Sequence, residues 1–118
     1  MKVEYYNPVD EKNGCIVRSI SKALNRDYID IKNELINMSN NYYDEDIFEK
    51  YLKEHNFYID NSYNNKKLSD IFLDGINIVL AYNNDWYHMV CIIDNVIFDK
   101  NDYNKLKDLK IIKVYRLN

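Results

Sequence analysis

The chain has 118 residues, 47% of them hydrophobic, which is the length of one domain with enough apolar side chains for an ordinary core. Its formal net charge of −3 argues against nucleic-acid binding, which is usually accompanied by a basic excess. No apolar run approaches the length of a membrane span, and no segment has the pattern of an export signal. Two cysteines are too few for a disulfide framework. We therefore expect a cytoplasmic protein with no membrane partner and with one domain over residues 1–118.

The first half of the chain is predicted to be mainly helical. Residues 1–12 contain the only proline, Pro8, and should form an ordered loop or a short extended segment. Apolar residues at helical spacing then predict helices over 15–24, from Asp27 to about residue 38, and from residue 44 or 45 to residue 55. Residues 57–59 are expected to be a short strand or an extended connection.

The second half of the chain has the pattern of a sheet. A brief helix over 69–75, capped by Ser69 and ended by Gly75, is followed by strands predicted at 76–82, 86–93 and 96–99. After a polar connection over 101–108, residues 109–117 should form a closing strand whose lysines protect an exposed edge. Helices followed by an antiparallel sheet indicate an α+β fold.

Cys15 is the first candidate for chemistry. Asn13 and Gly14 precede the predicted helix 15–24 and supply the loop and capping chemistry at its start. Cys15 is therefore placed at the first turn, where free N–H groups and the positive end of the helix dipole stabilise a thiolate. The alternative is a buried structural cysteine, which is the interpretation we prefer for Cys91.

His88 lies on the predicted central strand 86–93. With Asp94-Asn95 as a two-residue turn, Val90 faces Asp99, so His88 lies diagonal to Asp99 on the same face of the sheet. Asn101 would lie directly across from His88 if the pairing continued. Either side chain can orient an imidazole, although a satisfied core histidine and a strand-ending aspartate remain alternatives.

Two blocks of the sequence carry a resemblance to a known family: residues 13–24 (NGCIVRSISKAL) and residues 68–99, which begin LSDIF and end HMVCIIDNVIFD. They resemble the nucleophile helix and the histidine-bearing hairpin of small papain-like cysteine peptidases, including compact ones encoded by bacteriophages and prophages. The resemblance implies a papain-like α+β fold with Cys15 as nucleophile, His88 as general base and acid, and Asp99 as orienting residue. It implies hydrolysis of a peptide or isopeptide amide in a protein or peptide substrate, without a metal or organic cofactor.

The chain departs from that family at the oxyanion donor. Where the family usually has a Gln a few positions before the nucleophile, this chain has Val9, and only Asn7, Asp10 and Asn13 are nearby. Asn7 or Asn13 would have to serve, and Asn7 is preferred because Asn13 has a competing role at the helix entry. Two alternatives remain open: a catalytically weak binding protein, such as a mobile-element inhibitor of a host factor, and an acyltransferase or deamidase that uses the same three residues.

Overall fold

The computed structural model describes all 118 residues and is an α+β structure, as predicted. The helices are α1 (Cys15–Leu24), α2 (Tyr28–Met38), α3 (Glu45–Glu54) and α4 (Tyr103–Leu106). The strands are β1 (Lys2–Tyr5), β2 (Phe57–Asp60), β3 (Ile76–Asn83), β4 (Trp86–Ile93), β5 (Val96–Asp99) and β6 (Lys110–Leu117). None of the helices has the length and apolar character needed to cross a membrane.

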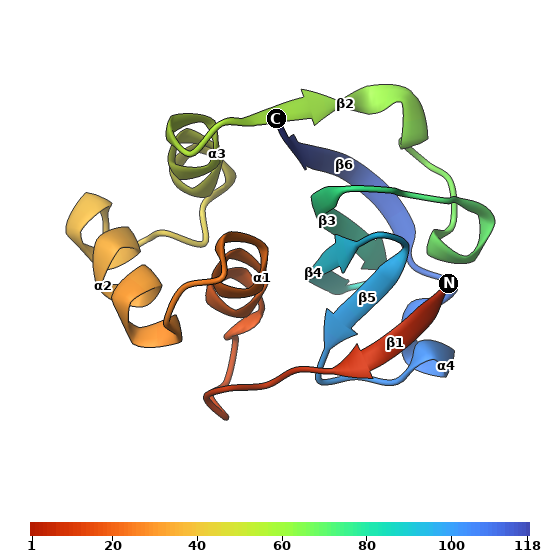
Figure 1. The fold of residues 1–118 in the computed structure, drawn as a ribbon, viewed down its shortest axis with the longest axis horizontal. Coiled ribbons are helices and arrows are strands. Elements are labelled where there is room, and N and C mark those ends of the chain that lie inside the picture. Colours follow the sequence, from red (N-terminus) through yellow and green to blue (C-terminus); the bar gives the residue numbers. More distant parts are fainter.

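The three long helices form where the apolar spacing predicts them, and they cover one face of the sheet (Figure 1). α1 buries Ile16, Val17 and Ile20 and lies between α2 and the sheet. Asp27 caps α2, as predicted, because its Oδ1 accepts hydrogen bonds from the backbone N–H groups of Ile29 and Asp30 at 2.9 and 3.3 Å. The N-terminal half of the chain therefore supplies a helical layer with α1 in its centre.

The six strands have the order β1-β5-β4-β3-β6-β2. All neighbours are antiparallel except β1 and β5, which are parallel, so the expectation of a wholly antiparallel sheet is wrong. The additional strand β1 comes from the segment that was predicted as a loop or extended lead-in. Its partner is far away in the chain, and such a parallel pairing leaves no local turn signal in the sequence.

The prediction that the last strand is an edge is also wrong, because β6 pairs with β3 on one side and β2 on the other. Its lysines do not protect an edge. Lys113 Nζ instead donates to Glu49 Oε2 of α3 at 2.6 Å and lies 3.4 Å from Glu45 Oε1. The lysine thus links β6 to an acidic helix.

The face of the sheet opposite the long helices packs on short irregular segments. Residues 69–75 do not form the predicted helix: a 3₁₀ turn, Leu68–Asp70, is followed by an extended stretch, and Ser69 caps nothing. The predicted polar connection contains α4. The reason in both places is burial against the sheet, since four leucines from these segments are fully buried there: Leu68, Leu73, Leu106 and Leu109.

The two strands of the hairpin, β4 and β5, differ in length, so part of one edge of β4 has no neighbouring strand. The observed pairs Cys91–Phe98, Ile92–Ile97 and Ile93–Val96 confirm the predicted register. β5 has only four residues against eight in β4, so the first half of β4 has no β5 neighbour. α1 lies along this open edge instead, where Ser19 Oγ donates to the Met89 carbonyl at 3.0 Å.

Candidate active site

Cys15 is the first residue of α1, half-buried, at the place where the helix meets the open edge of β4. The N-cap residue is Gly14, and no side chain caps the helix start. The predicted capping role of Asn13 is therefore not observed. The first-turn N–H groups and the positive end of the helix dipole stay available to an anion beside Cys15.

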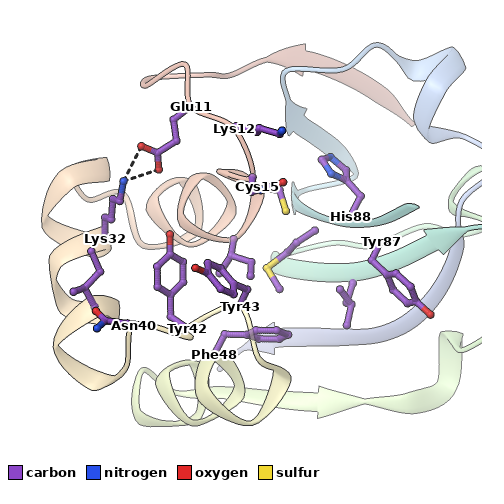
Figure 2. Close-up of a pocket in the computed structure, with 15 residues that line it drawn as sticks. Glu11, Lys12, Cys15, Lys32, Asn40, Tyr42, Tyr43, Phe48, Tyr87 and His88 are labelled. Carbon is purple, nitrogen blue, oxygen red and sulfur yellow. Dashed lines mark hydrogen bonds and ion pairs between the residues drawn. The ribbon is translucent and has the colours of Figure 1, made fainter. Parts of the chain in front are cut away.

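Gly14 has a steric reason to be glycine. A Cβ atom at this position would lie 2.6 Å from the Tyr28 hydroxyl and 3.2 Å from the Glu11 carbonyl oxygen. The Tyr28 hydroxyl is not free to move away, because it donates to Glu11 Oε1 at 2.8 Å, and Lys32 Nζ binds the same carboxylate. This network, drawn in part in Figure 2, holds the loop before Cys15 close to α2.

His88 is buried on β4 and faces Cys15 at the edge of a cavity (Figure 2). Its Nε2 lies 3.1 Å from both carboxylate oxygens of Asp99, and its ring stacks on Trp86 with the ring centres 4.5 Å apart. Since Asp99 occupies Nε2, Nδ1 is the nitrogen left to interact with the Cys15 thiol. The predicted contact between Asp99 and His88 is confirmed.

Asp99 is fully buried at the end of β5 and is held by neighbours on every side. Arg18 of α1 donates to Oδ1 at 3.0 Å, and Asn101 donates to Oδ2 from its backbone N–H at 3.0 Å and from its Nδ2 at 2.9 Å. Asn101 was expected directly across from His88, but β5 has ended at Asp99, so Asn101 holds the carboxylate instead of the imidazole. A buried carboxylate with this many donors has one fixed orientation.

The electrostatics of the site favour a thiolate and an imidazolium. Burial raises the pKa of the Cys15 thiol, but the hydrogen bond and charge of His88 and the Met89 backbone N–H outweigh it and place this pKa below its ordinary value. Burial lowers the pKa of His88, and the hydrogen bonds and charges of Asp99 and Cys15 raise it above its ordinary value. The pKa of Asp99 is raised by burial but falls below its ordinary value because His88, Asn101 and Arg18 stabilise the carboxylate.

Arg18 is a site residue that sequence reasoning missed. It is 1% exposed, and its only ion pair is the one to Asp99. The sequence does contain a signal, because Arg18 is three residues after Cys15 and thus lies on the same side of the helix, within the apolar stripe. A charged side chain in a buried stripe requires an acidic partner, and the register already placed Asp99 near His88.

The two oxyanion candidates are in different places. Asn13 has a positive φ of 60° and lines both cavities that Cys15 lines. Asn7 lines neither cavity, and its Nδ2 is directed to Asp10 Oδ1 at 3.4 Å. The structure therefore reverses the preference for Asn7.

Cys15 and His88 lie between two cavities. One has a volume of about 780 Å³ and a largely apolar and aromatic wall that includes Tyr42, Tyr43, Phe48, Leu80 and Tyr87. The other has a volume of about 490 Å³ and a polar wall that includes Trp86 and several lysines. The two cavities therefore meet at Cys15 and His88.

Cys91 differs from Cys15 as expected. It is fully buried in the core under the helices, and burial raises the pKa of its thiol to about 12. It has no part in the site.

Comparisons with protein-family models, curated proteins and solved structures give no match to this chain. Function is therefore inferred from the geometry and chemistry of the site itself.

Proposed function

We propose that the chain is a papain-like thiol hydrolase that cleaves a peptide or isopeptide amide in a protein or peptide substrate. The observation that carries this proposal is the arrangement of Cys15, His88 and Asp99, in which three separate elements place the thiol beside the imidazole at a cavity and the Asp99 carboxylate 3.1 Å from His88 Nε2. A nucleophile, a base within hydrogen-bond reach and an acid that orients the base are the requirements for acyl transfer through a thiol.

In the first half of the reaction, the Cys15 thiolate attacks the carbonyl carbon of the amide. An S–C bond forms, and the carbonyl oxygen becomes an oxyanion. As the C–N bond breaks, the His88 imidazolium gives its proton to the leaving nitrogen, so that a neutral amine departs and an acyl-enzyme remains. Asp99 keeps the ring in place and stabilises the positive charge that it carries before this transfer.

In the second half, neutral His88 takes a proton from water. The water oxygen bonds to the acyl carbon, the C–S bond breaks, and a carboxylic acid leaves. Cys15 departs as a thiolate next to the His88 imidazolium, which restores the starting state. The oxyanion in both halves would accept hydrogen bonds from the Cys15 backbone N–H at the uncapped start of α1 and from the Asn13 side chain.

This chemistry needs a reduced thiol. We therefore place the activity in the cytoplasm, where thiols are kept reduced. Both cysteines are free in the structure, in agreement with this assignment.

The direct test is trapping of the acyl-enzyme. Wild-type protein is incubated with a peptidyl acyloxymethyl ketone and, separately, with a library of quenched fluorescent peptides. We expect one covalent adduct on Cys15 by mass spectrometry and cleavage of a subset of peptides. Cys15→Ala and His88→Ala should lose both, whereas the matched control Cys91→Ala should keep both. Cleavage that survives in Cys15→Ala would overturn the proposal.

The second candidate is a binding protein on the same scaffold. The observation that favours it is Val9, which leaves the oxyanion without the amide donor usual in the resembled family. In that case Cys15 would react with the ketone, but no peptide would be cleaved, and Cys15→Ala would bind its protein target as tightly as the wild type.

A further inference from the structure

The smaller of the two cavities beside Cys15 carries a local excess of positive charge. Lys12, Lys100 and Lys105 line it, and they come from three different places: the loop before α1, the turn after β5, and α4. Lys105 Nζ lies 4.7 Å from the centre of the Trp86 ring, which stacks on His88. The lysines therefore surround the reactive end of the site in a chain whose formal net charge is −3.

These charges have no carboxylate partners in the protein. None of the three lysines forms an ion pair, although ten such pairs are present elsewhere in the structure. Asp85 supplies the only carboxylate in the wall of the cavity, whereas the charge of Arg18, which also lines it, is paired with Asp99. The buried Nε of Arg18, in the same wall, has no hydrogen-bond acceptor. The cavity therefore has more donors and more positive charge than the protein itself uses.

The larger cavity is more apolar, and the charge of Lys32 in its wall is paired with Glu11. Nine of its fifteen lining residues are hydrophobic, and Figure 2 shows Tyr42, Tyr43 and Phe48 gathered on the side away from Lys12. The two cavities share Lys12, Asn13, Cys15, Tyr87 and His88, whereas Lys100 and Lys105 line only the smaller one. A bond that lies over Cys15 thus has an apolar cavity on one side and a cationic cavity on the other.

We propose that the substrate is an amphiphilic peptide segment with a bulky apolar side chain on one side of the scissile bond and acidic side chains on the other. The aromatic cavity receives the apolar side chain, and Lys12, Lys100 and Lys105 receive the carboxylates. This inference rests on the proposed function, since it names the substrate class of the same site. Complementary charge steers the acidic end to the lysines and fixes the direction in which the segment lies over Cys15.

The test measures binding without turnover. Trp86 is the only tryptophan and lies in the wall of the lysine cavity, so its fluorescence reports occupancy. Cys15→Ala is titrated with capped eight-residue peptides that have Gly-Gly in the centre, Phe on one side and two Glu on the other, in both directions. Matched peptides carry Gln or Lys in place of Glu. We expect one direction of the Glu peptide to bind about tenfold more tightly than its Gln counterpart at low salt, and the difference to shrink as salt is added.

Charge variants in the Cys15→Ala background locate the effect. Lys100→Glu and Lys12→Glu should each reduce the preference for Glu over Gln several-fold. The matched control, Lys50→Glu, makes the same charge change at an exposed site on α3 and should leave the preference unchanged. Asp85→Asn removes the only free acid of the cavity and should strengthen binding of the Glu peptide, a gain that structural damage cannot produce.

The binding and cleavage results test the acidic-segment specificity and the hydrolase activity separately. Charge-dependent binding together with no cleavage by the wild type would contradict the hydrolase and leave the acidic-segment specificity standing. Cleavage or binding that is the same for Glu, Gln and Lys peptides would overturn the specificity and leave the hydrolase standing. Absence of binding by every peptide, or equal effects of Lys100→Glu and Lys50→Glu, would also overturn the specificity.

Discussion

Cys15 and Cys91 carry the same functional group in opposite surroundings. Cys15 is half-buried and has His88 and the Met89 N–H as partners, while Cys91 lies in the core between its cross-strand neighbours Ile78 and Phe98. The first environment lowers the pKa of a thiol and the second raises it. Reactivity toward an electrophile follows the population of thiolate, so the two positions should be easy to distinguish.

We expect limited iodoacetamide treatment near neutral pH to label Cys15 and to leave Cys91 unmodified in the folded protein. Peptide mass spectrometry gives the site and rate of labelling. His88→Ala should slow the reaction at Cys15 on the order of tenfold, since it removes the main partner of the thiolate. Equal labelling of both cysteines, or faster labelling of Cys91, would contradict the assignment.

The pH dependence of alkylation tests the role of Asp99. In the wild type the rate should rise with pH around a midpoint below the ordinary thiol pKa of 9.0. Asp99→Asn removes the carboxylate that raises the pKa of His88, so less of the imidazole is protonated. The thiolate of Cys15 then has a weaker partner, and the midpoint of the alkylation rate should move to higher pH.

A control is needed because Asp99→Asn also leaves Arg18 buried without its ion-pair partner. The double variant Arg18→Met/Asp99→Asn removes that charge and should be more stable, with an upward movement at least as large, because the Arg18 charge also lowers the pKa of Cys15. A midpoint that stays at the wild-type pH in both variants would show that Asp99 has no influence on the thiol.

At the scale of elements, the start of α1 depends on close contact with α2. Gly14→Ala would place a methyl group 2.6 Å from the Tyr28 hydroxyl, so either Tyr28 or the 11–14 loop must move. We expect a loss of about 1–3 kcal/mol in stability and a fall of roughly 10–100-fold in the alkylation and cleavage rates, because Asn13 and Cys15 shift with the loop.

Removing the Tyr28 hydroxyl provides the matched control for Gly14→Ala. Tyr28→Phe deletes the hydroxyl that the new methyl group would meet, so Gly14→Ala/Tyr28→Phe should recover part of the rate lost in Gly14→Ala. Thermal melts and rates of the three variants decide the question. A Gly14→Ala protein with wild-type rate and stability would mean that the entry loop adapts without cost.

The helices and strands that depend on local sequence signals were predicted correctly. The helices 15–24 and 28–38 and the strands 86–93 and 96–99 follow from apolar spacing, an Asp cap and a two-residue turn, and all are observed. The parallel strand β1 and the internal place of β6 were not predictable, because they depend on which distant strands pair. The helix expected at 69–75 fails because burying Leu73 and the preceding Leu68 against the sheet outweighs its helical caps.

The candidate site was predictable through strand register. Counting outward from the Asp94-Asn95 turn placed Asp99 on the face of His88, and the contact is observed. Asn101 would have lain across from His88 only if the pairing had continued, and β5 ends at Asp99. Arg18 was missed because an arginine in a helix is usually assumed to face water, whereas this one lies in the apolar stripe.

At the scale of the whole molecule, the cavity and the core respond differently to the same substitution. Cys15→Ser is nearly isosteric at the edge of a cavity and should leave the melting temperature almost unchanged. Cys91→Ser places a hydroxyl group without a partner in a fully buried apolar core and should cost on the order of 1–3 kcal/mol, which lowers the melting temperature by several degrees. If Cys15→Ser unfolds the protein and Cys91→Ser does not, the two cysteines have been assigned the wrong way round.

The open edge of β4 also determines when the nucleophile becomes reactive as the chain is synthesised. α1 leaves the ribosome early, but both partners that stabilise the Cys15 thiolate, His88 and the Met89 N–H, belong to β4. β4 in turn pairs with β3, whose other neighbour is β6, the last strand of the sheet in chain order. Until β4 is in place, Cys15 lacks the two groups that lower its pKa, so we expect the thiol to acquire its reactivity only when the sheet has formed.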